Sequence, residues 1–460
     1  MMIKEEEIHM KVKKIITLLL VVAMMTGIIG CTNADNDASL NESTTDNAAV
    51  NEETSDDSQA TTDEEIVLNV WHQWSNDTNE LKKLYDEAVA AYEAEHPNVV
   101  INTETLDTEA YKTKIAAEFA GSASGIDVFY YWGAGMARKL VNADALLPLD
   151  DYLTDDVKAR ILPGSTGAFE YNGQTFSVPM FSWYMTLFAN KALFDEAGTK
   201  IPTTYAELVS ASEKLLALDD VTPFAAGAKD GWNAAFIYQA MALREVGGDD
   251  VNAMLRGEKP FTAQGYEEAA KKVSELYDMG AFGKNPLESG NDDANSAFIT
   301  GKAAMRLMGS WFANQVYTDA TATIDPDQVV AVNIPVIEGK GNPSDYAGGF
   351  IESFWVNKGT SYPAEAAEFA IYINEKMGQA AYETGTGFSG WTGDFDESGL
   401  NPLFIQIKEL LSEGETGVLA WDTSLDSEPA TIHNELVQTL FADGFDIEAF
   451  IEDHESAINQ

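Results

Sequence analysis

The pattern of apolar positions from residue 66 onward predicts repeated strand–helix units. Ile66 to Val70 alternates apolar and polar residues as a half-buried strand does. Residues 79–95 then place apolar side chains at helical spacing. A second strand over 99–104, a second helix over 111–120 and a third strand over 126–131 follow. Strand–helix–strand units at this spacing favour a parallel α/β sheet.

The segment from Thr175 to Ala189 is rich in aromatic residues and contains only small polar ones, which favours strand. Pro179 has no N–H group, so a central position in a sheet is disfavoured there. We therefore expect one strand that leads to Pro179 and another that leads away from it. Trp183 and Tyr184 follow directly. This arrangement is typical of a chain that passes between two lobes beside a ligand.

The rest of the chain is mostly helical in pattern, with short strands between the helices. Thr204 and Glu207 have the spacing of a capping box at the start of one helix. The other expected helices cover 190–197, 232–246, 265–279, 364–375 and most of 403–458. The other expected strands cover 305–308 and 329–335, and 347–356 is an apolar, Gly-rich stretch.

The first thirty residues have the pattern of an export signal. Three lysines precede the apolar run from Ile15 to Met25, which is too short for a comfortable membrane span. Ile28-Ile29-Gly30-Cys31 resembles a bacterial lipoprotein cleavage site, in which the cysteine becomes the lipidated N-terminus. We expect removal of residues 1–30 and a lipid on Cys31, the alternative being an incidental cysteine. Because Cys31 is the single cysteine, no disulfide within the chain can form.

Residues 31–65 are expected to form a disordered, acidic tether. Thr32 to Glu65 contains 11 acidic residues and no Lys or Arg, so it cannot bury enough apolar surface to fold. The remaining chain still has 61 acidic against 24 basic residues, and the whole chain has a net charge of −47. This charge argues against nucleic acid or an anionic membrane surface as a ligand.

A series of landmarks, in a fixed order from Ile66 to the C-terminus, resembles the extracellular solute-binding proteins of ABC importers. The similarity is to their carbohydrate-binding, maltose-binding-protein-like class. The most characteristic landmark is the segment from Phe298 to Trp311, which reads FITGKAAM and ends in Gly-Ser-Trp. The other landmarks are Ile66 to Trp74, Tyr92 to Val99, Asp127 to Phe129, Leu146 to Leu149, Tyr171 to Pro179 and Phe188 to Lys191.

The resemblance implies two Rossmann-like α/β lobes joined by hinge strands, which is the type II fold of periplasmic binding proteins. Lobe one would comprise 66–177 plus 348–385, and lobe two would comprise 178–347 plus 386–460. The chain would cross between the lobes near 177–180, 346–349 and 384–390. Glycines at these crossings are suited to absorbing the rotation of a hinge.

Aromatic and polar residues beyond the carboxyl ends of strands are the candidate ligand-binding residues, because ligands of open α/β sheets bind there. Sugar rings stack on aromatic side chains and their hydroxyls need planar polar partners. The aromatic candidates are Trp71, Trp74, Trp132, Trp183, Tyr184, Trp232, Trp311 and Trp391. Trp421 and Asp422 are a weaker pair of candidates. The others are His72, Gln73, Asp77, Asp107, Gly349 and Asp394. The alternative for each ring is an ordinary core position, and for each polar residue a solvated loop.

The resemblance implies a monomeric binding protein without enzymatic activity, cofactor or metal. It would capture a mono- or oligosaccharide and hand it to ABC permease subunits, while its lipid holds it at the outer face of the cytoplasmic membrane. Three alternatives stay open. They are a secreted glycoside hydrolase, an adhesion lipoprotein without a small ligand, and a binder of a peptide, a polyamine or an iron chelate. The chain contains no local catalytic motif and no histidine cluster typical of zinc.

Overall fold

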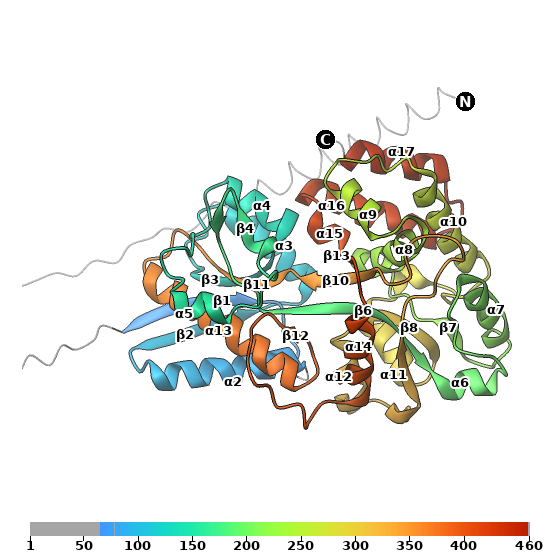
Figure 1. Cartoon of the computed structure of the whole chain (residues 1–460), viewed down its shortest axis with the longest axis horizontal. Helices are drawn as coiled ribbons and strands as arrows, with labels where there is room; N and C mark the ends of the chain where they lie inside the picture. The colour runs from blue at the N-terminus through green and yellow to red at the C-terminus, as the bar shows by residue number, and fades with distance from the viewer. Residues whose placement is uncertain (1–64, 78, 459–460) are drawn as a thin grey trace, which may run out of the picture. The chain divides into compact units, whose positions relative to one another are not determined.

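The computed structural model describes residues 65–77 and 79–458, which belong to one compact unit. The expected export signal, Cys31 and all but the last residue of the expected tether lie outside the described residues. Within the described part, no helix is long and apolar enough to cross a membrane. The unit contains two lobes, each built around one sheet (Figure 1).

The first lobe contains a four-stranded sheet in the order β11–β3–β1–β2. Strand β1 pairs in parallel with both β2 and β3, whereas β11 is antiparallel to β3. Helices α2 and α13 lie on one side of this sheet and α3 and α4 on the other (Figure 1). The strands are β1 (Ile66–His72), β2 (Val99–Thr105), β3 (Val128–Trp132) and β11 (Glu352–Val356), with the hairpin β4 (Glu170–Tyr171) and β5 (Gln174–Thr175). The helices are α2 (Glu80–Glu95), α3 (Thr108–Ala120), α4 (Ala134–Asn142), α5 (Asp155–Arg160), η1 (Gly167–Phe169) and α13 (Pro363–Glu383).

The second lobe contains a mixed sheet centred on β6 (Phe181–Asn190). Strand β6 is antiparallel to all four of its partners, so this sheet differs from the parallel pattern that the strand–helix units predict. The other strands are β7 (Thr222–Phe224), β8 (Ala303–Gly309), β9 (Val329–Val332), β10 (Tyr346–Phe350), β12 (Phe388–Ser389) and β13 (Gly417–Val418).

Helices surround this second sheet on both faces (Figure 1). The helices from the middle of the chain are α6 (Lys191–Glu196), α7 (Tyr205–Leu215), α8 (Gly231–Val246), α9 (Gly248–Leu255), α10 (Gln264–Asp278), η2 (Pro286–Glu288), α11 (Asn291–Ile299), α12 (Phe312–Thr318) and η3 (Pro326–Gln328). Those of the C-terminal tail are α14 (Pro402–Ser412), α15 (Trp421–Ser424), α16 (Ser427–Gln438), η4 (Thr439–Phe441) and α17 (Ile447–Ile458).

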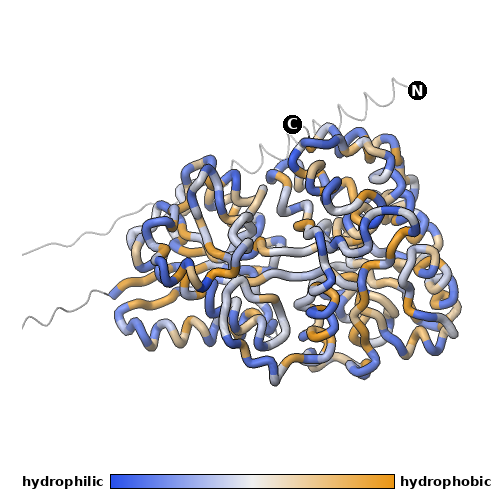
Figure 2. Tube along the Cα trace, in the orientation of Figure 1, coloured by the Kyte–Doolittle hydropathy of each residue, from blue (hydrophilic) through white to orange (hydrophobic). Residues whose placement is uncertain are grey.

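Strand β6 is buried along its whole length, and most of its residues are apolar, as is typical of a strand with both faces covered. Its alternate side chains enter two different hydrophobic clusters of the second lobe. One cluster receives Trp183, Met185, Leu187 and Ala189, and the other receives Tyr184 and Phe188. Figure 2 shows apolar segments along the strands inside each lobe and polar positions along the outer helices.

The expected elements occur where the patterns place them, including the break at Pro179 between β5 and β6. Thr204 and Glu207 form the predicted capping box at the start of α7. The mixed α/β fold is therefore confirmed, with boundaries that shift by a few residues.

The first passage between the lobes lies later in the chain than the expected crossing at 177–180. Phe176, Val178, Met180 and Phe181 pack into the first lobe's core, whereas Trp183 packs into the second. The reason is hydrogen bonding to β11: the Ser177 hydroxyl is 2.5 Å from the Ser353 hydroxyl and donates to the carbonyl of Phe354 at 2.6 Å. The start of β6 therefore makes the passage (Figure 1).

The other two passages also lie later than expected. Strand β10 pairs with β6 in the second lobe and β11 pairs with β3 in the first, so the chain passes over at Ile351. The third passage follows α13, with β12 paired to β6 and Trp391 still packed in the first lobe's core. It ends at α14, which packs in the second lobe.

Candidate functional site

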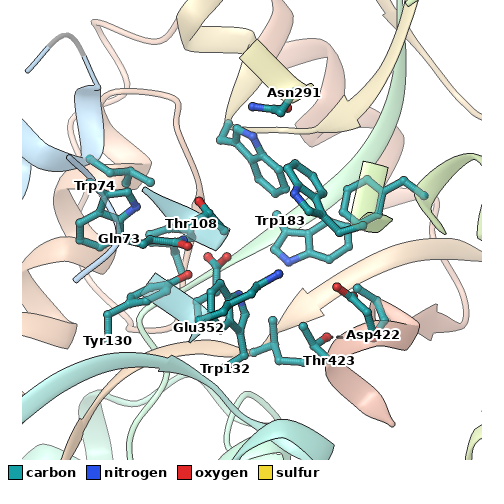
Figure 3. A pocket seen from close by; sticks show the side chains of 18 of the residues that line it. Gln73, Trp74, Thr108, Tyr130, Trp132, Trp183, Asn291, Glu352, Asp422 and Thr423 are labelled. Atoms are coloured by element: carbon teal, nitrogen blue, oxygen red, sulfur yellow. Dashed lines mark hydrogen bonds between the residues drawn. The ribbon is translucent and has the colours of Figure 1, made fainter. Parts of the chain in front are cut away.

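A cavity of about 200 Å³ lies between the two lobes, at the start of β6 and the passage at Ile351. Both lobes contribute to its lining, and Figure 3 shows the side chains that surround it. The first lobe contributes Gln73, Trp74, Asn79, Leu81, Thr108, Lys112, Tyr130, Trp132, Ile351 and Glu352. Phe181, Trp183, Trp232, Phe236, Asn291, Trp311, Ala420, Asp422 and Thr423 complete the lining.

The second-lobe wall of the cavity is a cluster of aromatic rings. Trp183 stacks on Phe236 with ring centroids 5.3 Å apart and meets the edge of Trp311 at 5.6 Å. Trp232, at the start of α8, contacts the same Phe236 at 5.3 Å. Gly309 makes room for this cluster, because a Cβ there would lie 2.1 Å from the Trp311 ring. The rings support one another and present apolar faces to the cavity.

The first-lobe wall combines aromatic rings with hydrogen-bonding groups. Tyr130 and Trp132 are alternate residues of β3, so their side chains lie on one face of the sheet. Tyr130 contacts Trp74 and Trp132 edge-to-face, with centroids 5.0 and 5.2 Å apart. The Tyr111 hydroxyl donates to the backbone carbonyl of Tyr130 at 2.5 Å and so ties α3 to this strand.

Glu352 is the carboxyl group of this wall, and Figure 3 shows it pointing toward the middle of the cavity. It is the cross-strand neighbour of Trp132 in the β11–β3 ladder. The Tyr130 hydroxyl and the Trp132 indole N–H both donate to its carboxylate. Burial raises the pKa of Glu352 to about 7, against the opposite effect of these two donors.

Two amides reach the cavity from opposite lobes. The Gln73 side-chain oxygen is buried without a hydrogen-bond partner. The Asn291 oxygen accepts a hydrogen bond from Arg306 at 3.0 Å. Arg306 is fully buried and also donates to Asn233 and Asn295, so it fixes the amides at the start of α11 and α8. A buried, unpartnered oxygen at a cavity wall is suited to a ligand hydroxyl.

A second carboxyl group and an ammonium group lie at the side of the cavity. Burial raises the pKa of Asp422 on α15, while Lys112 and Asn434 oppose that shift. Lys112 comes from α3, pairs with Glu109 at 3.2 Å and lies 5.2 Å from the centre of the Trp132 ring. The polar groups of the site therefore come from both lobes.

A larger cavity of about 570 Å³ adjoins the first and shares Lys112, Trp232 and Asp422 with it. It runs between α3 and α4 of the first lobe and α16 of the second. Its lining is mainly polar and aliphatic, including Lys139, Lys229 and Gln438. The two cavities together make an elongated space between the lobes.

The lobes touch each other at the rim of this space, on α4 and α15. Arg138 donates to Asp426 at 2.9 Å across the two lobes. A Cβ at Gly135 would lie 2.1 Å from the backbone oxygen of Leu425, so only glycine allows this approach. The structure therefore holds the lobes together around the cavities.

The structure brings a subset of the predicted residues to the cavity. These are Gln73, Trp74, Trp132, Trp183, Trp232 and Trp311, with Asp422 from the weaker pair. They come from six separate stretches: two at strand ends of the first lobe and four in the strands, helices and loops of the second lobe.

Four predicted residues lie in the core instead, because their side chains are on the inner faces of their strands or loops. Trp71 is buried beneath Lys114, whose ammonium is 4.2 Å from the ring centre. His72 is fully buried, which lowers its pKa to about 3, and its Nδ1 accepts from the Trp74 N–H. Tyr184 donates to Asn333 at 2.8 Å and Trp391 donates to the Pro179 carbonyl at 2.7 Å.

Four further predicted residues also lie outside the cavity lining. Asp107 caps α3 by accepting from the Ala110 N–H at 3.2 Å. Asp77 is exposed beside Lys82, and Asp394 is exposed. Gly349 has a φ of +144° in β10, where it pairs with Trp183. This φ favours glycine, and a Cβ there would also lie 2.7 Å from the end of the Leu419 side chain.

Sequence reasoning missed several lining residues, above all Tyr130, Glu352, Lys112 and Asn291. Tyr130 could have been found by strand alternation, because Trp132 lies two residues later on β3. Within residues 65–77 and 79–458, no group of three or more His, Cys, Asp or Glu side chains is arranged to hold a metal ion.

Comparison with known proteins identifies relatives along most of the chain. The family model "Bacterial extracellular solute-binding protein" matches residues 75–380. An uncharacterised ABC transporter extracellular-binding protein of Pyrococcus horikoshii is 25% identical over 326 residues, which is 68% of this chain and 69% of the relative. The maltotriose-binding protein of Pyrococcus abyssi is 26% identical over 253 residues, 54% of this chain and 50% of that protein.

A solved structure, from a study of xylan utilization by the thermophilic bacterium Caldanaerobius polysaccharolyticus, has a similar fold. It superposes with a TM-score of 0.81 and 34% sequence identity. The match covers 85% of this chain and 99% of that chain.

Proposed function

Because the chain belongs to the family of bacterial extracellular solute-binding proteins, we propose that it captures an oligosaccharide between its lobes for an ABC importer. The lobes would close on the sugar, and the loaded protein would deliver it to the membrane permease subunits. The family is one of binding proteins, so the chain's part in import is capture rather than chemistry.

The observation that carries the proposal is the cavity with five tryptophans, three in one wall and two in the other. Flat apolar rings match the C–H faces of pyranose sugars, and amides and carboxyls match their hydroxyls. We assign stacking to Trp74, Trp132, Trp183, Trp232 and Trp311, and hydrogen bonding to Gln73. A peptide or polyamine would find fewer matching groups, because the wall is mainly aromatic.

An oligosaccharide fits the site better than a monosaccharide, because the tryptophan-lined cavity continues into the larger one. A chain of rings would begin among the tryptophans and extend between α3, α4 and α16. The solved relative from work on xylan utilization makes xylo-oligosaccharides the first ligands to try.

The proposed function also assigns roles to the N-terminal part of the chain. Removal of residues 1–30 and lipidation of Cys31 would hold the protein, as a monomer, at the outer face of the cytoplasmic membrane. The acidic segment 31–65 would then be the tether between the lipid and the binding unit. Metabolic labelling with an alkyne fatty acid should mark the wild type and leave a Cys31→Ser variant unlabelled.

The proposal is tested by calorimetric titration of the purified protein with xylotriose, maltotriose, mannotriose and chitotriose. We expect one ligand per chain, saturable binding of at least one trisaccharide, and weaker binding of the matching monosaccharide. A rise in melting temperature with the same sugar should accompany binding. Failure of all four to bind would contradict the proposal.

The same samples address the hydrolase alternative. The cavity contains two carboxyl groups, Glu352 and Asp422, and a glycoside hydrolase needs such a pair. We expect the bound trisaccharide to remain intact for hours at a stoichiometric protein concentration. Shorter products that appear in proportion to protein concentration would favour the hydrolase.

A further inference from the structure

Glu352 occupies the point where the first lobe, the passage between the lobes and the cavity meet. It is the first residue of β11 and follows Ile351, where the chain leaves the second sheet. The Glu352 carbonyl accepts from the Met180 N–H at 3.3 Å, next to the start of β6. The Glu352 side chain therefore lies one residue away from the passage between the lobes.

The carboxyl group of Glu352 is held in place by neutral donors alone. Tyr130 and Trp132 donate to it, and no Lys, Arg or His among the described residues forms an ion pair with it. Holding a partly buried carboxylate without a cationic partner costs free energy, so a purely structural role is poorly served by this residue. A glutamine or a tyrosine at position 352 would fill the same place beside Tyr130 and Trp132 without the free-energy cost of burying a charge.

The surroundings of Glu352 leave its remaining acceptor positions directed at the cavity. A carboxylate can accept about four hydrogen bonds, and the protein supplies two. The lining contains other side chains that can donate, Gln73, Thr108, Lys112 and Asn291, but among the described residues only Tyr130 and Trp132 form hydrogen bonds with the Glu352 carboxylate. The free acceptor positions therefore match hydroxyl groups on a ring that is stacked between the walls.

We propose that Glu352 is a specificity-determining residue, whose ionised carboxylate accepts hydrogen bonds from neighbouring hydroxyls of the sugar and thereby makes capture dependent on pH. This inference rests on the proposed function and adds to it the residue that distinguishes one pyranose from another. A sugar whose hydroxyls point away from the carboxylate would leave its remaining acceptor positions shielded from water and unfilled, and would bind more weakly.

The direction of the pH dependence follows from the carboxyl group. Burial raises the pKa of Glu352 to about 7, so around neutrality a fraction of the empty sites carries a proton. Hydroxyl donors stabilise the ionised form, so ligand binding releases that proton to the buffer. Affinity is then full above pH 7 and falls below it, by about tenfold from pH 8 to pH 6.

The other titratable groups near Glu352 must be weighed as alternative sources of a pH dependence of binding. His72 on β1 has a pKa lowered to about 3 by burial, and the pKa of Tyr130 on β3 is raised well above 10. Lys112 on α3 forms an ion pair with Glu109. Asp422 on α15 also has a raised pKa, so it is the group whose contribution must be separated from that of Glu352.

The test is calorimetric titration at pH 8, 7 and 6 with the tightest binder among xylotriose, maltotriose, mannotriose and chitotriose. Glu352→Gln keeps an oxygen that accepts from Tyr130 and Trp132 but cannot be ionised. We expect at least tenfold weaker binding at pH 8 and the same affinity at all three pH values. Glu352→Asp should keep the pH dependence at reduced affinity, and Asp422→Asn should also keep it.

The control is Glu87→Gln, an exposed glutamate on α2 that should match the wild type at every pH. Titration in two buffers of different ionisation enthalpy should show proton release by the wild type near pH 7 and none by Glu352→Gln. The inference is overturned if Glu352→Gln binds within twofold of the wild type at pH 8, or if it keeps the pH dependence. If the wild type binds none of the four sugars, the proposed function fails together with this inference.

Discussion

The two walls of the cavity differ in chemistry, although both are aromatic. The second-lobe wall is formed by Trp183, Trp232, Phe236 and Trp311, which pack on one another. The first-lobe wall sets a carboxyl group between the donors of Tyr130 and Trp132 and adds the unpartnered oxygen of Gln73. One wall therefore offers ring faces, and the other offers ring faces with directed polar groups.

Because of this difference, the two lobes contribute to ligand recognition in different ways. Stacking depends on contact area and tolerates changes in hydroxyl orientation, whereas hydrogen bonds to a fixed carboxyl do not. We infer that the second lobe supplies affinity for pyranose rings in general and the first lobe chooses among them.

Removal of a second-lobe ring should give the largest loss of affinity. Trp311→Ala deletes a face of the stacking wall and should weaken binding of every trisaccharide that binds, by roughly thirtyfold or about 2 kcal/mol. Calorimetry measures this loss, and the order of preference among the sugars should be unchanged. Tyr152→Ala, a partly buried ring outside both cavities, is the matched control.

Neutralising the first-lobe carboxyl should stabilise the empty protein while it weakens binding. The raised pKa of Glu352 means that its ionised form destabilises the fold above pH 7, and that this penalty disappears as the pH falls from 7 toward 4.5. Glu352→Gln should therefore raise the free energy of unfolding at pH 8 by up to about 3 kcal/mol, and the difference should fall below about 1 kcal/mol at pH 5. Urea unfolding measures both values, and a destabilised variant at pH 8 would contradict the division between the lobes.

A substitution at the contact between the lobes can leave both walls of the cavity intact. Alanine at Gly135 on α4 would place its Cβ 2.1 Å from the Leu425 backbone oxygen, so the lobes must separate. Alanine also favours the helix over glycine, so the empty protein should not lose stability. We expect about tenfold weaker sugar binding, comparable to about 1.4 kcal/mol, and Gly125→Ala, which meets nothing within 4 Å, should bind like the wild type.

The ion pair at the rim should contribute least. Arg138 and Asp426 are both mainly exposed, and such pairs contribute about 0 to 1 kcal/mol. Arg138→Gln should therefore weaken binding by no more than about threefold, an effect that decreases further at high salt. A larger loss in calorimetry would mean that closure, rather than the two walls, dominates affinity.

Hydrophobic periodicity was sufficient for the strands and helices, because nearly every element is an apolar-faced segment of ordinary length. It was less informative about which tryptophans reach the cavity. Trp71 and Trp74 lie at the same strand end, yet Trp71 packs under Lys114 and Trp74 lines the cavity. Trp391 lies near a passage, but its N–H bonds to the Pro179 carbonyl and keeps the ring in the core.

The polar groups of the site are harder to find from the sequence for a physical reason. Glu352 is one of 75 acidic residues and belongs to no local motif. Its position in the cavity arises because β11 lies antiparallel beside β3, which joins Glu352 to residues more than 200 positions earlier in the chain. Lys112 and Asp422 come together in the same way, from α3 and α15.

The most direct test of this account is a crystal structure of the protein with its tightest-binding trisaccharide. We predict pyranose rings stacked between the tryptophans of the two walls, with ring hydroxyls within about 3 Å of the Glu352 carboxylate. A sugar bound outside the cavity, or one whose hydroxyls all point away from Glu352 toward the second lobe, would contradict it.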